Sequence, residues 1–305
     1  MMSPSLPLAI EFLKTHQNPD GGWGYEPGRM SLVEPSAFSL LAIHSIGDKT
    51  GTAGGLDFLR SCQKGTGAIG IGPKDADGSW MSYAALLAFH ELGAGAEEQR
   101  LKDWVLNFDD ASGRFTKEEI SIVASRYRYD ASIPGWSWTP RTTAWVEPTA
   151  LFVLALRAIG VPATEKRVRS GVDLILDRRV PSGGWNFGNP YSKSFELEAS
   201  TMSTALALAA LGAAGVAESR PAVRSGLGFL EAALGGDIST ASLAWALLAL
   251  KSFPSGAPRV AGATARLARL QMKDGSLRGN IFETALSYLV LNDAPILYPV
   301  RGGKR

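Results

Sequence analysis

The chain of 305 residues has one cysteine, three histidines and almost no excess of charge. A lone cysteine, Cys62, excludes an internal disulfide and a cysteine-cluster metal site, and it is typical of a reducing compartment. The net charge of +2 does not predict nucleic-acid binding, which requires a strongly basic face. No apolar run reaches the ~20 residues that span a bilayer, and Met1–Pro7 lacks the basic and then apolar pattern of a secretory signal. These absences predict a cytoplasmic protein.

What the chain does contain is a repeated phrase, seen most clearly in Trp145–Gly160. Pro148 suits the first turn of a helix, where its missing N–H is not needed. Glu147 would stand at the positive end of the helix dipole. Gly160 can adopt the left-handed conformation that ends a helix. The residues between are apolar on nearly every side, so the phrase predicts a helix buried among other helices.

Five similar stretches begin near Val33, Ser79, Thr201, Ile238 and Phe282. All six share a Ser or Thr, which is followed by Ala in five of them. The steps between these hydroxyl residues are 46, 67, 55, 36 and 44 residues, and a period of this size is typical of repeat architectures. The aligned residues are Ser36, Ser82, Thr149, Thr204, Thr240 and Thr284.

An amphipathic helix is predicted before each buried one, so the chain consists of six helix pairs. The amphipathic segments are Leu8–Gln17, Gly55–Gln63, Gln99–Phe108, Val168–Leu176, Val223–Ala233 and Thr264–Gln271. Strand signals are short and isolated, at Ala68–Ile71 and Ser121–Val123. The pattern predicts an all-α (α/α)6 barrel, or toroid, with the apolar helices inside and residues 1–305 as one domain. An open solenoid is the alternative, but the last repeat lacks the polar cap of a solenoid end, which favours closure.

The loops within the helix pairs are rich in glycine and carry Gln and Trp, as in Gln17–Gly24, Gln63–Gly70, Pro181–Gly188 and Gln271–Ser276. Left-handed turn residues with a Trp over the joint are the physical interpretation. Phe12–Trp23 resembles the Gln–Trp repeat motif of squalene and oxidosqualene cyclases, and its Asp-Gly-Gly-Trp phrase is similar to one in protein prenyltransferase β subunits. The resemblance covers all six units and implies the superfamily fold.

The resemblance also implies where a catalytic acid would stand. Class II terpene cyclases protonate an alkene or epoxide with the middle Asp of an Asp-x-Asp-Asp motif, typically followed by Thr-Ala, at the start of a buried helix. This chain lacks that motif. In an alignment on Thr149 and Ala150, Glu147 takes the position of the proton donor, and Glu34 does so in the first unit. An apolar, aromatic cavity would raise the pKa of such a carboxyl and suit it to act as an acid.

A structural interpretation of the same residues stands beside this one. Glu-Pro-Thr and Glu-Pro-Ser are helix-start signals, and their occurrence in two repeats favours that role. Asp77 is the third candidate acid, within Asp75–Ser79, a stretch that also suits a simple turn. Full triterpene cyclases have two such helical domains, and this chain is about half that length.

The prenyltransferase resemblance would require a zinc ion held by Asp, Cys and His, together with a partner subunit. His44 and His90 both fall at the far end of a buried helix, where Arg157 stands in the third unit. A position that accepts His or Arg is unsuited to a metal ligand, and His16 has no partner at metal-ligand spacing. The sequence therefore predicts no metal and no cofactor.

The longest insertion, Phe108–Ala144, predicts a lid or binding loop, because loops longer than ~12–15 residues in a compact domain often have that role. It leads into Glu147 and would lie at the mouth where the buried helices begin, with three arginines placed to hold a diphosphate or carboxylate group. A solvated loop held by its aromatic residues is the alternative. The candidate ligand contacts are Trp80, Tyr83, Trp136, Trp138, Trp145, Arg126, Arg128 and Arg141.

Three functions remain open from the sequence. The first is an isoprenoid-handling enzyme of the cyclase type, with a hydrophobic isoprenoid-like ligand and Glu147 as acid. The second is a non-catalytic protein that binds a lipid or a partner protein. The third is a carbohydrate-active barrel, for which Asp75 with Asp77 and Asp109 with Asp110 are the nearest carboxylate pairs. Apolar segments such as Pro295–Val300 are compatible with peripheral membrane contact, and the oligomeric state is left open.

Overall fold

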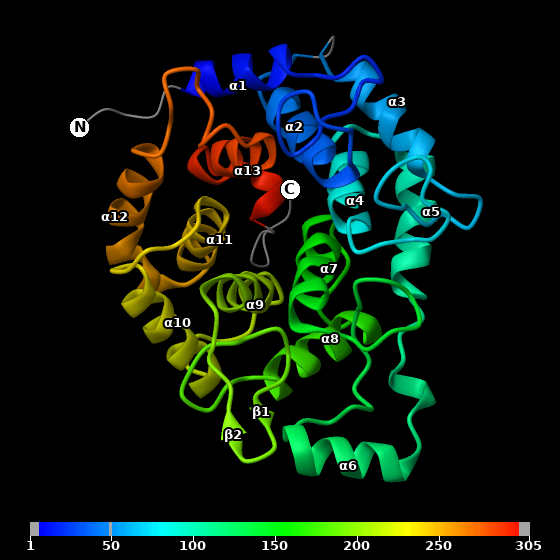
Figure 1. Ribbon diagram of the computed structural model, residues 1–305, viewed down its shortest axis with the longest axis vertical. Coiled ribbons are helices and arrows are strands. Elements are labelled where there is room, and N and C mark those ends of the chain that lie inside the picture. Colours follow the sequence, from blue (N-terminus) through cyan, green and yellow to red (C-terminus); the bar gives the residue numbers. More distant parts are fainter. Residues whose placement is uncertain (1–5, 49–50, 299–305) are drawn as a thin grey trace. The chain divides into compact units, whose positions relative to one another are not determined.

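The computed structural model describes residues 6–48 and 51–298 (Figure 1). Nearly all regular structure in this part of the chain is helical, which confirms the predicted all-α class. A hairpin of two short antiparallel strands, β1 (Tyr191–Ser192) and β2 (Phe195–Glu196), is the exception. The helices are α1 (Leu6–Thr15), α2 (Val33–Ser45), α3 (Ala53–Cys62), α4 (Ser82–Glu91), α5 (Gly95–Leu106), α6 (Lys117–Tyr127), α7 (Val146–Ala158), α8 (Lys166–Asp177), α9 (Thr201–Ala213), α10 (Pro221–Ala233), α11 (Thr240–Lys251), α12 (Ala257–Ala268) and α13 (Ile281–Leu291).

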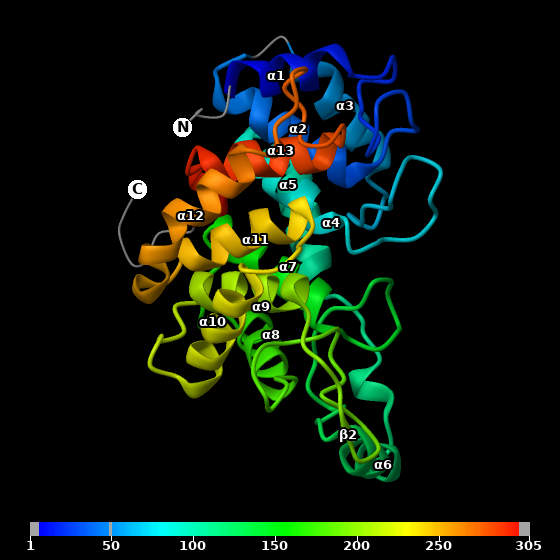
Figure 2. The same cartoon turned by 60° about the vertical axis from the view of Figure 1, so that its left-hand side comes forward.

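The described helices form two compact units. The first unit comprises 6–107 and 262–297, and in it α2 packs against both α4 and α13. The second comprises 108–261 and Tyr298, and in it α9 packs against both α7 and α11 (Figures 1 and 2). The expectation of one domain over 1–305 stays a prediction.

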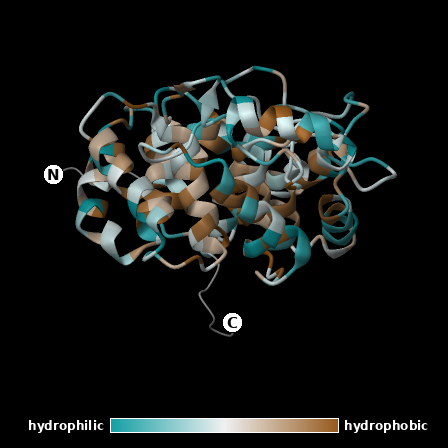
Figure 3. Cartoon of the chain, turned by 90° about the horizontal axis from the view of Figure 1, so that it is seen from below, coloured by the Kyte–Doolittle hydropathy of each residue, from teal (hydrophilic) through white to brown (hydrophobic). Residues whose placement is uncertain are grey.

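Buried and amphipathic helices alternate along the chain, as the repeat predicts. In α9, for example, every residue from Ser203 to Ala213 is buried, whereas its partner α8 buries four of its twelve residues. The hydropathy colouring of Figure 3 shows brown residues mainly on the helices and teal residues in many of the loops. Because an apolar stripe must be covered, each amphipathic helix packs its stripe on a buried helix and leaves its charges in water.

In three of the six repeats the shared Ser or Thr holds the tryptophan of the preceding loop. Thr204 Oγ1 accepts a hydrogen bond of 2.9 Å from the Trp185 amide and donates one of 3.1 Å to the Trp185 carbonyl. Ser36 does the same for Trp23, at 2.8 and 3.2 Å. Thr149 does so for Trp136, at 3.0 and 3.2 Å. These hydroxyls and tryptophans are fully buried, so each bond satisfies a backbone group that water cannot reach.

The indole and glutamine side chains complete the joint. The Trp23 and Trp185 indole N–H groups donate to carbonyls ten residues earlier, at Leu13 and Ile175, over 2.7 and 2.6 Å. Gln17 Nε2 donates to the carbonyl of Gly21 at 2.7 Å and closes the turn. Gln63 and Gln271 make the same bond in their own turns, to the carbonyls of Gly67 and Gly275 at 3.2 and 3.0 Å.

Gly21 shows how tightly these turns pack on the next repeat. Its backbone has φ +85°, and a Cβ there would lie 2.2 Å from the carbonyl oxygen of Gly54 near the start of α3. Only glycine fits both the conformation and the space. The left-handed end of α7 at Gly160, with φ +87°, is also as predicted.

The insertion 108–144 differs from the expected loop. Ser121–Val123, interpreted as a weak strand signal, lies inside α6, an exposed helix with no buried residue. Thr116 and Glu119 form a capping box at its start, and this Thr-x-x-Glu signal is visible in the sequence. The other strand signal, Ala68–Ile71, forms an isolated bridge between Ile69 and Gln63.

Two predictions concern the ends of the chain, the lack of a secretory signal in Met1–Pro7 and the apolar segment Pro295–Val300. Met1–Ser5 lies outside the described residues, as do positions 299 and 300 of the apolar segment Pro295–Val300. The described part of that segment is a short helical turn in which Ile296 and Leu297 are buried, so these side chains are not available to a membrane. Among the described helices, none combines the length and the apolar character needed to cross a bilayer.

We expect the hydroxyl of Thr204 to make a large contribution to stability. In Thr204→Val the amide and carbonyl of Trp185 lose their partner in a buried site, which should lower the free energy of unfolding by about 1–3 kcal/mol. Thr201→Val, three residues earlier on α9, removes a half-buried hydroxyl and is the matched control. Urea denaturation measures both, and equal effects would exclude the proposed importance of this bond.

Candidate functional site

Glu34 lies in the first turn of α2 with its side chain 5 % exposed, and two tyrosines donate hydrogen bonds to its carboxyl group. Tyr25 Oη lies 2.5 Å from Oε2, and Tyr83 Oη, from α4, lies 2.6 Å from Oε1. No lysine, arginine or histidine forms an ion pair with Glu34 in the part of the chain described. The carboxyl is therefore enclosed by hydroxyl groups without a neutralising charge.

Burial raises the pKa of Glu34 from 4.5 to about 7, although the two tyrosine hydroxyls act in the opposite direction. The same burial, with the nearby carboxylate, raises the pKa of Tyr25 and of Tyr83 far above the ordinary value. Both tyrosines therefore remain protonated donors. Glu34 can gain or lose a proton near neutral pH, which suits an acid or a base.

Aromatic rings surround this carboxyl. The ring of Phe282, on α13, meets Tyr25 and Phe38 edge to face at centroid distances of 6.0 and 5.1 Å. Trp80 stacks on Tyr83 at 6.1 Å. Two predicted ligand contacts, Trp80 and Tyr83, thus lie beside a predicted acid, and Tyr83 contacts that acid directly.

Glu147 takes the corresponding place in α7, with its side chain 8 % exposed. Its Oε1 accepts a hydrogen bond of 2.7 Å from Ser203 Oγ, and Ser203 Oγ in turn accepts one of 2.8 Å from Ser200 Oγ, the N-cap of α9. Burial raises the pKa of Glu147, and the Ser203 hydroxyl acts in the opposite direction. Among the described residues, no donor contacts Oε2, so that oxygen is the one suited to carry a proton.

A hollow of about 510 Å³ lies beside this glutamate. Its walls are mainly apolar, from Trp138, Trp145, Phe187 and Leu197, with Ser200 at one edge. Trp145 precedes Glu147 by two residues and Ser200 is linked to it through Ser203. A volume of this size is typical of small-molecule sites. Two of the predicted ligand contacts, Trp138 and Trp145, therefore line one hollow.

The loop that forms one wall of the hollow rests on a buried arginine. Arg178 is 1 % exposed, its Nη1 donates to the carbonyl of Gly188 at 3.1 Å, and its guanidinium lies 3.5 Å from the ring centre of Tyr129. Burial lowers the pKa of Arg178. Val146 N, at the start of α7, donates to the carbonyl of Phe187 at 2.9 Å. The loop is thereby tied to the helix that carries Glu147.

The three arginines predicted to hold an anionic group do not gather at one point. Arg126 is exposed on α6, and Arg128 ends that helix in a left-handed conformation with its guanidinium over the ring of Tyr191, 3.9 Å from its centre. Arg141 is exposed, and its backbone N–H donates to the carbonyl of Asp109 at 2.7 Å. The contacts of Arg128 and Arg141 help to hold the insertion, and an anion site formed by the three arginines stays a prediction.

Two further predicted site residues have structural surroundings. Asp77 is exposed in a turn where its amide donates to Asp75, and nothing joins it to Glu34. Trp136 is fully buried, stacked on Phe152 and covered by the guanidinium of Arg167. We therefore no longer expect Trp136 to contact a ligand.

Sequence reasoning missed several residues of these sites. Tyr25, Ser203, Ser200 and Arg178 were not selected, because their contacts depend on how the loops fold and, for Ser203 with Glu147, on the packing of two repeats. Tyr25 follows the loop tryptophan Trp23 by two residues. An aromatic residue this close to the predicted start of the buried helix could have been selected as a candidate site residue. Within the described residues, no group of three His, Cys, Asp or Glu side chains is placed to hold a metal ion.

Comparison with solved structures identifies the fold. The type II terpene cyclase MstE from Scytonema, in complex with geranylgeranyl dihydroxybenzoate, superposes with a TM-score of 0.64 and 16 % identity over 96 % of this chain and 97 % of that one. Its complex with merosterolic acid A gives 0.62 and 18 %, over 96 % of each chain. The chain has the fold of a type II terpene cyclase.

The same terpene cyclase fold, an (α/α) toroid, also occurs in glycoside-cleaving enzymes. An alpha-amylase from Clostridium perfringens matches with a TM-score of 0.64 and 10 % identity, over 95 % of this chain and 97 % of that one. No protein-family model matches the sequence, and no curated protein does. The comparisons confirm the predicted resemblance and the all-α toroid, and identities this low concern the fold alone.

Within this terpene cyclase fold, Glu34 should make stability depend on pH. Its pKa in the folded protein, about 7, lies above the ordinary value of 4.5. The folded state therefore holds the proton more tightly, and its advantage is present below pH 4.5 and is lost as the pH rises through 7. Between pH 5 and pH 8, this effect amounts to about 2 to 3 kcal/mol.

Glu34→Gln removes the titrating group and should flatten this dependence. Chemical denaturation at several pH values compares it with wild type, and Glu11→Gln, which alters an exposed glutamate on α1, is the control. If Glu34→Gln and wild type lose stability in parallel between pH 5 and pH 8, the raised pKa of Glu34 is wrong.

Proposed function

We propose that the protein binds an isoprenoid chain and cyclises it by protonation, with Glu147 as the acid. The observation that carries this proposal is a buried glutamic acid hydrogen-bonded through two serines to the edge of an apolar, tryptophan-lined hollow. The fold shared with MstE, whose structures hold a geranylgeranyl compound, supports the choice of ligand class.

The proposed chemistry begins with the proton on Glu147 Oε2. It passes to one carbon of a terminal C=C bond, the π electron pair forms the new C–H bond, and the other carbon becomes cationic. The π electrons of the next C=C bond attack that cation to close a ring, and loss of a proton from the last cation, to the Glu147 carboxylate or to water, gives a neutral product. Burial raises the pKa of Glu147, which favours the protonated form from which the acid reacts. The Ser203 hydroxyl then stabilises the carboxylate that forms. The faces of Trp138 and Trp145 are suited to attract the cation.

Binding without turnover is the second candidate. One observation favours it: Glu147 itself does not line the hollow, whereas Trp145 and Ser200 do. The chain also lacks the Asp-x-Asp-Asp motif. The carbohydrate alternative has less support, because Asp109 pairs with Arg114, and Asp110 holds Ser112 and the amide of Gly135. These carboxylates have structural partners within the insertion.

The test is an incubation with geranylgeranyl dihydroxybenzoate and, separately, geranylgeranyl diphosphate, with products identified by mass spectrometry. We expect a cyclised product from wild type, and a loss of about 100-fold or more in rate for Glu147→Gln, since a positioned general acid contributes that much. Ser203→Ala should lower the rate less, because it removes only the support of the carboxylate.

Glu34→Gln is the matched control, since it changes the same residue type in the same phrase of another repeat. Loss of activity in Glu34→Gln with retention in Glu147→Gln would transfer the role of acid to Glu34. Bound ligand without product in wild type would favour the second candidate. Neither binding nor product with either probe would contradict the isoprenoid proposal.

A further inference from the structure

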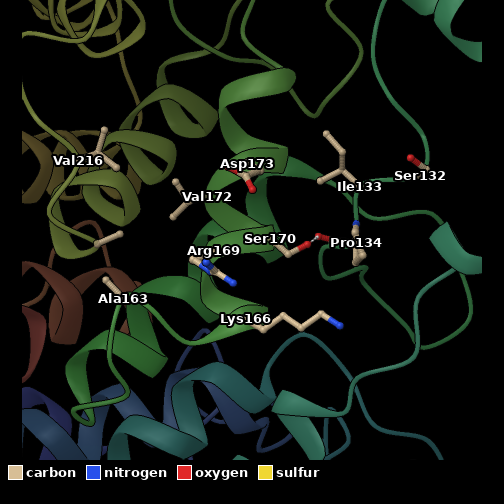
Figure 4. A pocket seen from close by; sticks show the side chains of 11 residues that line it. Ser132, Ile133, Pro134, Ala163, Lys166, Arg169, Ser170, Val172, Asp173 and Val216 are labelled. Atoms are coloured by element: carbon tan, nitrogen blue, oxygen red, sulfur yellow. Dashed lines mark hydrogen bonds between the residues drawn. The ribbon is translucent and has the colours of Figure 1, made fainter.

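The second unit contains another hollow, of about 650 Å³, along the outward side of α8 (Figure 4). Segment 132–134 of the insertion lies on one side of the helix, and Ala163 and Val216 lie on the other. An amphipathic outer helix ordinarily presents a convex, solvated face to water. Here the insertion and the turn after α9 flank that face and make it concave. The resulting hollow shares no lining residue with the hollow near Glu147.

The wall formed by the insertion is held at several points. Ser170 Oγ, on α8, donates to the carbonyl of Pro134 at 2.6 Å, and this bond is visible in Figure 4. The amide of Gly135, the next residue, donates to Asp110 Oδ2 at 2.6 Å. At the other end, the amide of Asp130 donates to Asp177 Oδ2 at 3.0 Å. A site with such fixed walls is preformed, so binding requires little ordering of the chain.

Two basic side chains line the hollow. Lys166 and Arg169 lie about one turn apart in the first half of α8, and both are exposed. Neither forms an ion pair with a carboxylate in the part of the chain described. Arg169 has Asp173 four residues later, which is the usual spacing for a helical ion pair, yet the two are not within ion-pair distance. Their charges therefore remain available to a ligand.

The backbone N–H groups of Arg167 and Val168 at the start of α8 are already bonded and do not serve an anion. The carboxylate of Glu165 already accepts hydrogen bonds from the amides of Arg167 and Val168. An anion would be held by the Lys166 and Arg169 side chains. Asp173, at the far end, is the one acidic residue that lines the hollow and should disfavour an anion placed close to it.

The remaining lining is largely apolar. Val172 from α8, Val216 and Ala214 from the turn after α9, and Ile133 from the insertion give surfaces suited to a hydrocarbon or aromatic body. The volume lies within the range of sites for small organic molecules. An inorganic anion alone would leave these side chains exposed to water.

We propose that this hollow is a binding site for a small amphiphilic organic anion, a phosphate ester or carboxylate with an apolar body. The anionic group contacts Lys166 and Arg169, and the apolar body lies against Val172 and Val216. The site is independent of Glu147, so it does not require the proposed cyclase function.

The experiment is isothermal titration calorimetry of the full chain with 1-naphthyl phosphate. Parallel titrations use 1-naphthoate, inorganic phosphate and 1-naphthol. We expect the two naphthyl anions to bind more tightly than phosphate or naphthol. Lys166→Ala with Arg169→Ala should weaken 1-naphthyl phosphate binding about fivefold or more, because two exposed ion pairs are lost. Added salt should weaken wild-type binding in the same direction.

Three further variants separate charge, shape and general effects. Ala214→Trp should block the hollow while it leaves the cations in place, and Asp173→Asn should tighten anion binding. Arg220→Ala with Arg224→Ala removes two exposed arginines from the start of α10 and should not change the affinity. Circular dichroism and thermal unfolding check that each variant folds.

Several outcomes would overturn the proposal. They are no binding of either naphthyl anion to the wild type, equal weakening by the α8 and α10 double variants, or unchanged affinity in folded Ala214→Trp. Equal binding of inorganic phosphate would reduce the site to a simple anion contact and contradict the amphiphilic ligand. Glu147→Gln should bind 1-naphthyl phosphate like wild type, so failure of this proposal and failure of the cyclase proposal are distinguishable.

Discussion

The hydrogen bonds between a repeat hydroxyl and the backbone of the preceding loop tryptophan determine where the buried helices begin. Thr149 and Ser36 each stand two residues after a glutamate. Because each hydroxyl holds the amide and carbonyl of a buried tryptophan, the first turn of its helix cannot slide or rotate. The glutamate in that turn is therefore positioned by hydrogen bonds that lie outside the candidate sites. The positions of both Glu34 and Glu147 thus follow from the fold.

The two glutamates occupy equivalent places but different surroundings. Glu34 has a tyrosine hydroxyl on each oxygen, whereas Glu147 has one serine hydroxyl on Oε1 and no donor on Oε2 among the described residues. An acid needs an oxygen whose proton can point at the substrate, and its conjugate base needs a donor. Glu147 meets both conditions, which is why the proposed chemistry begins there. Glu34, within an aromatic cluster, has a tyrosine donor on both oxygens, so neither oxygen is open to present a proton to a substrate.

Buried arginines explain why the insertion 108–144 is ordered. Arg167 donates to the carbonyls of Phe108 and Gly135, near both ends of the insertion, and lies over the ring of Trp136. Arg178 lies over Tyr129 and bonds to Gly188. Removing a guanidinium from water is costly unless carbonyls and aromatic faces replace the water. These contacts hold the insertion as a wall of two hollows, and its predicted role as a lid or binding loop stays a prediction.

Local chemistry was sufficient to predict the repeat, the buried and amphipathic helices, the left-handed end at Gly160 and the first-turn position of Glu147, because each depends on residues close in sequence. The resemblance in the Gln–Trp loops led to the correct fold because those turns recur several times along the chain. Tyr83 and Ser203 acquired their roles only in the tertiary structure, where helices of different repeats bring their hydroxyls to a carboxyl, and Tyr25 acquired its role through the folding of the loop before α2. The same holds for the basic residues of α8 and its C-cap: the sequence gives their charges, but long-range packing decided that Arg178 is buried, that Arg167 is half-buried and that Lys166 and Arg169 line a hollow.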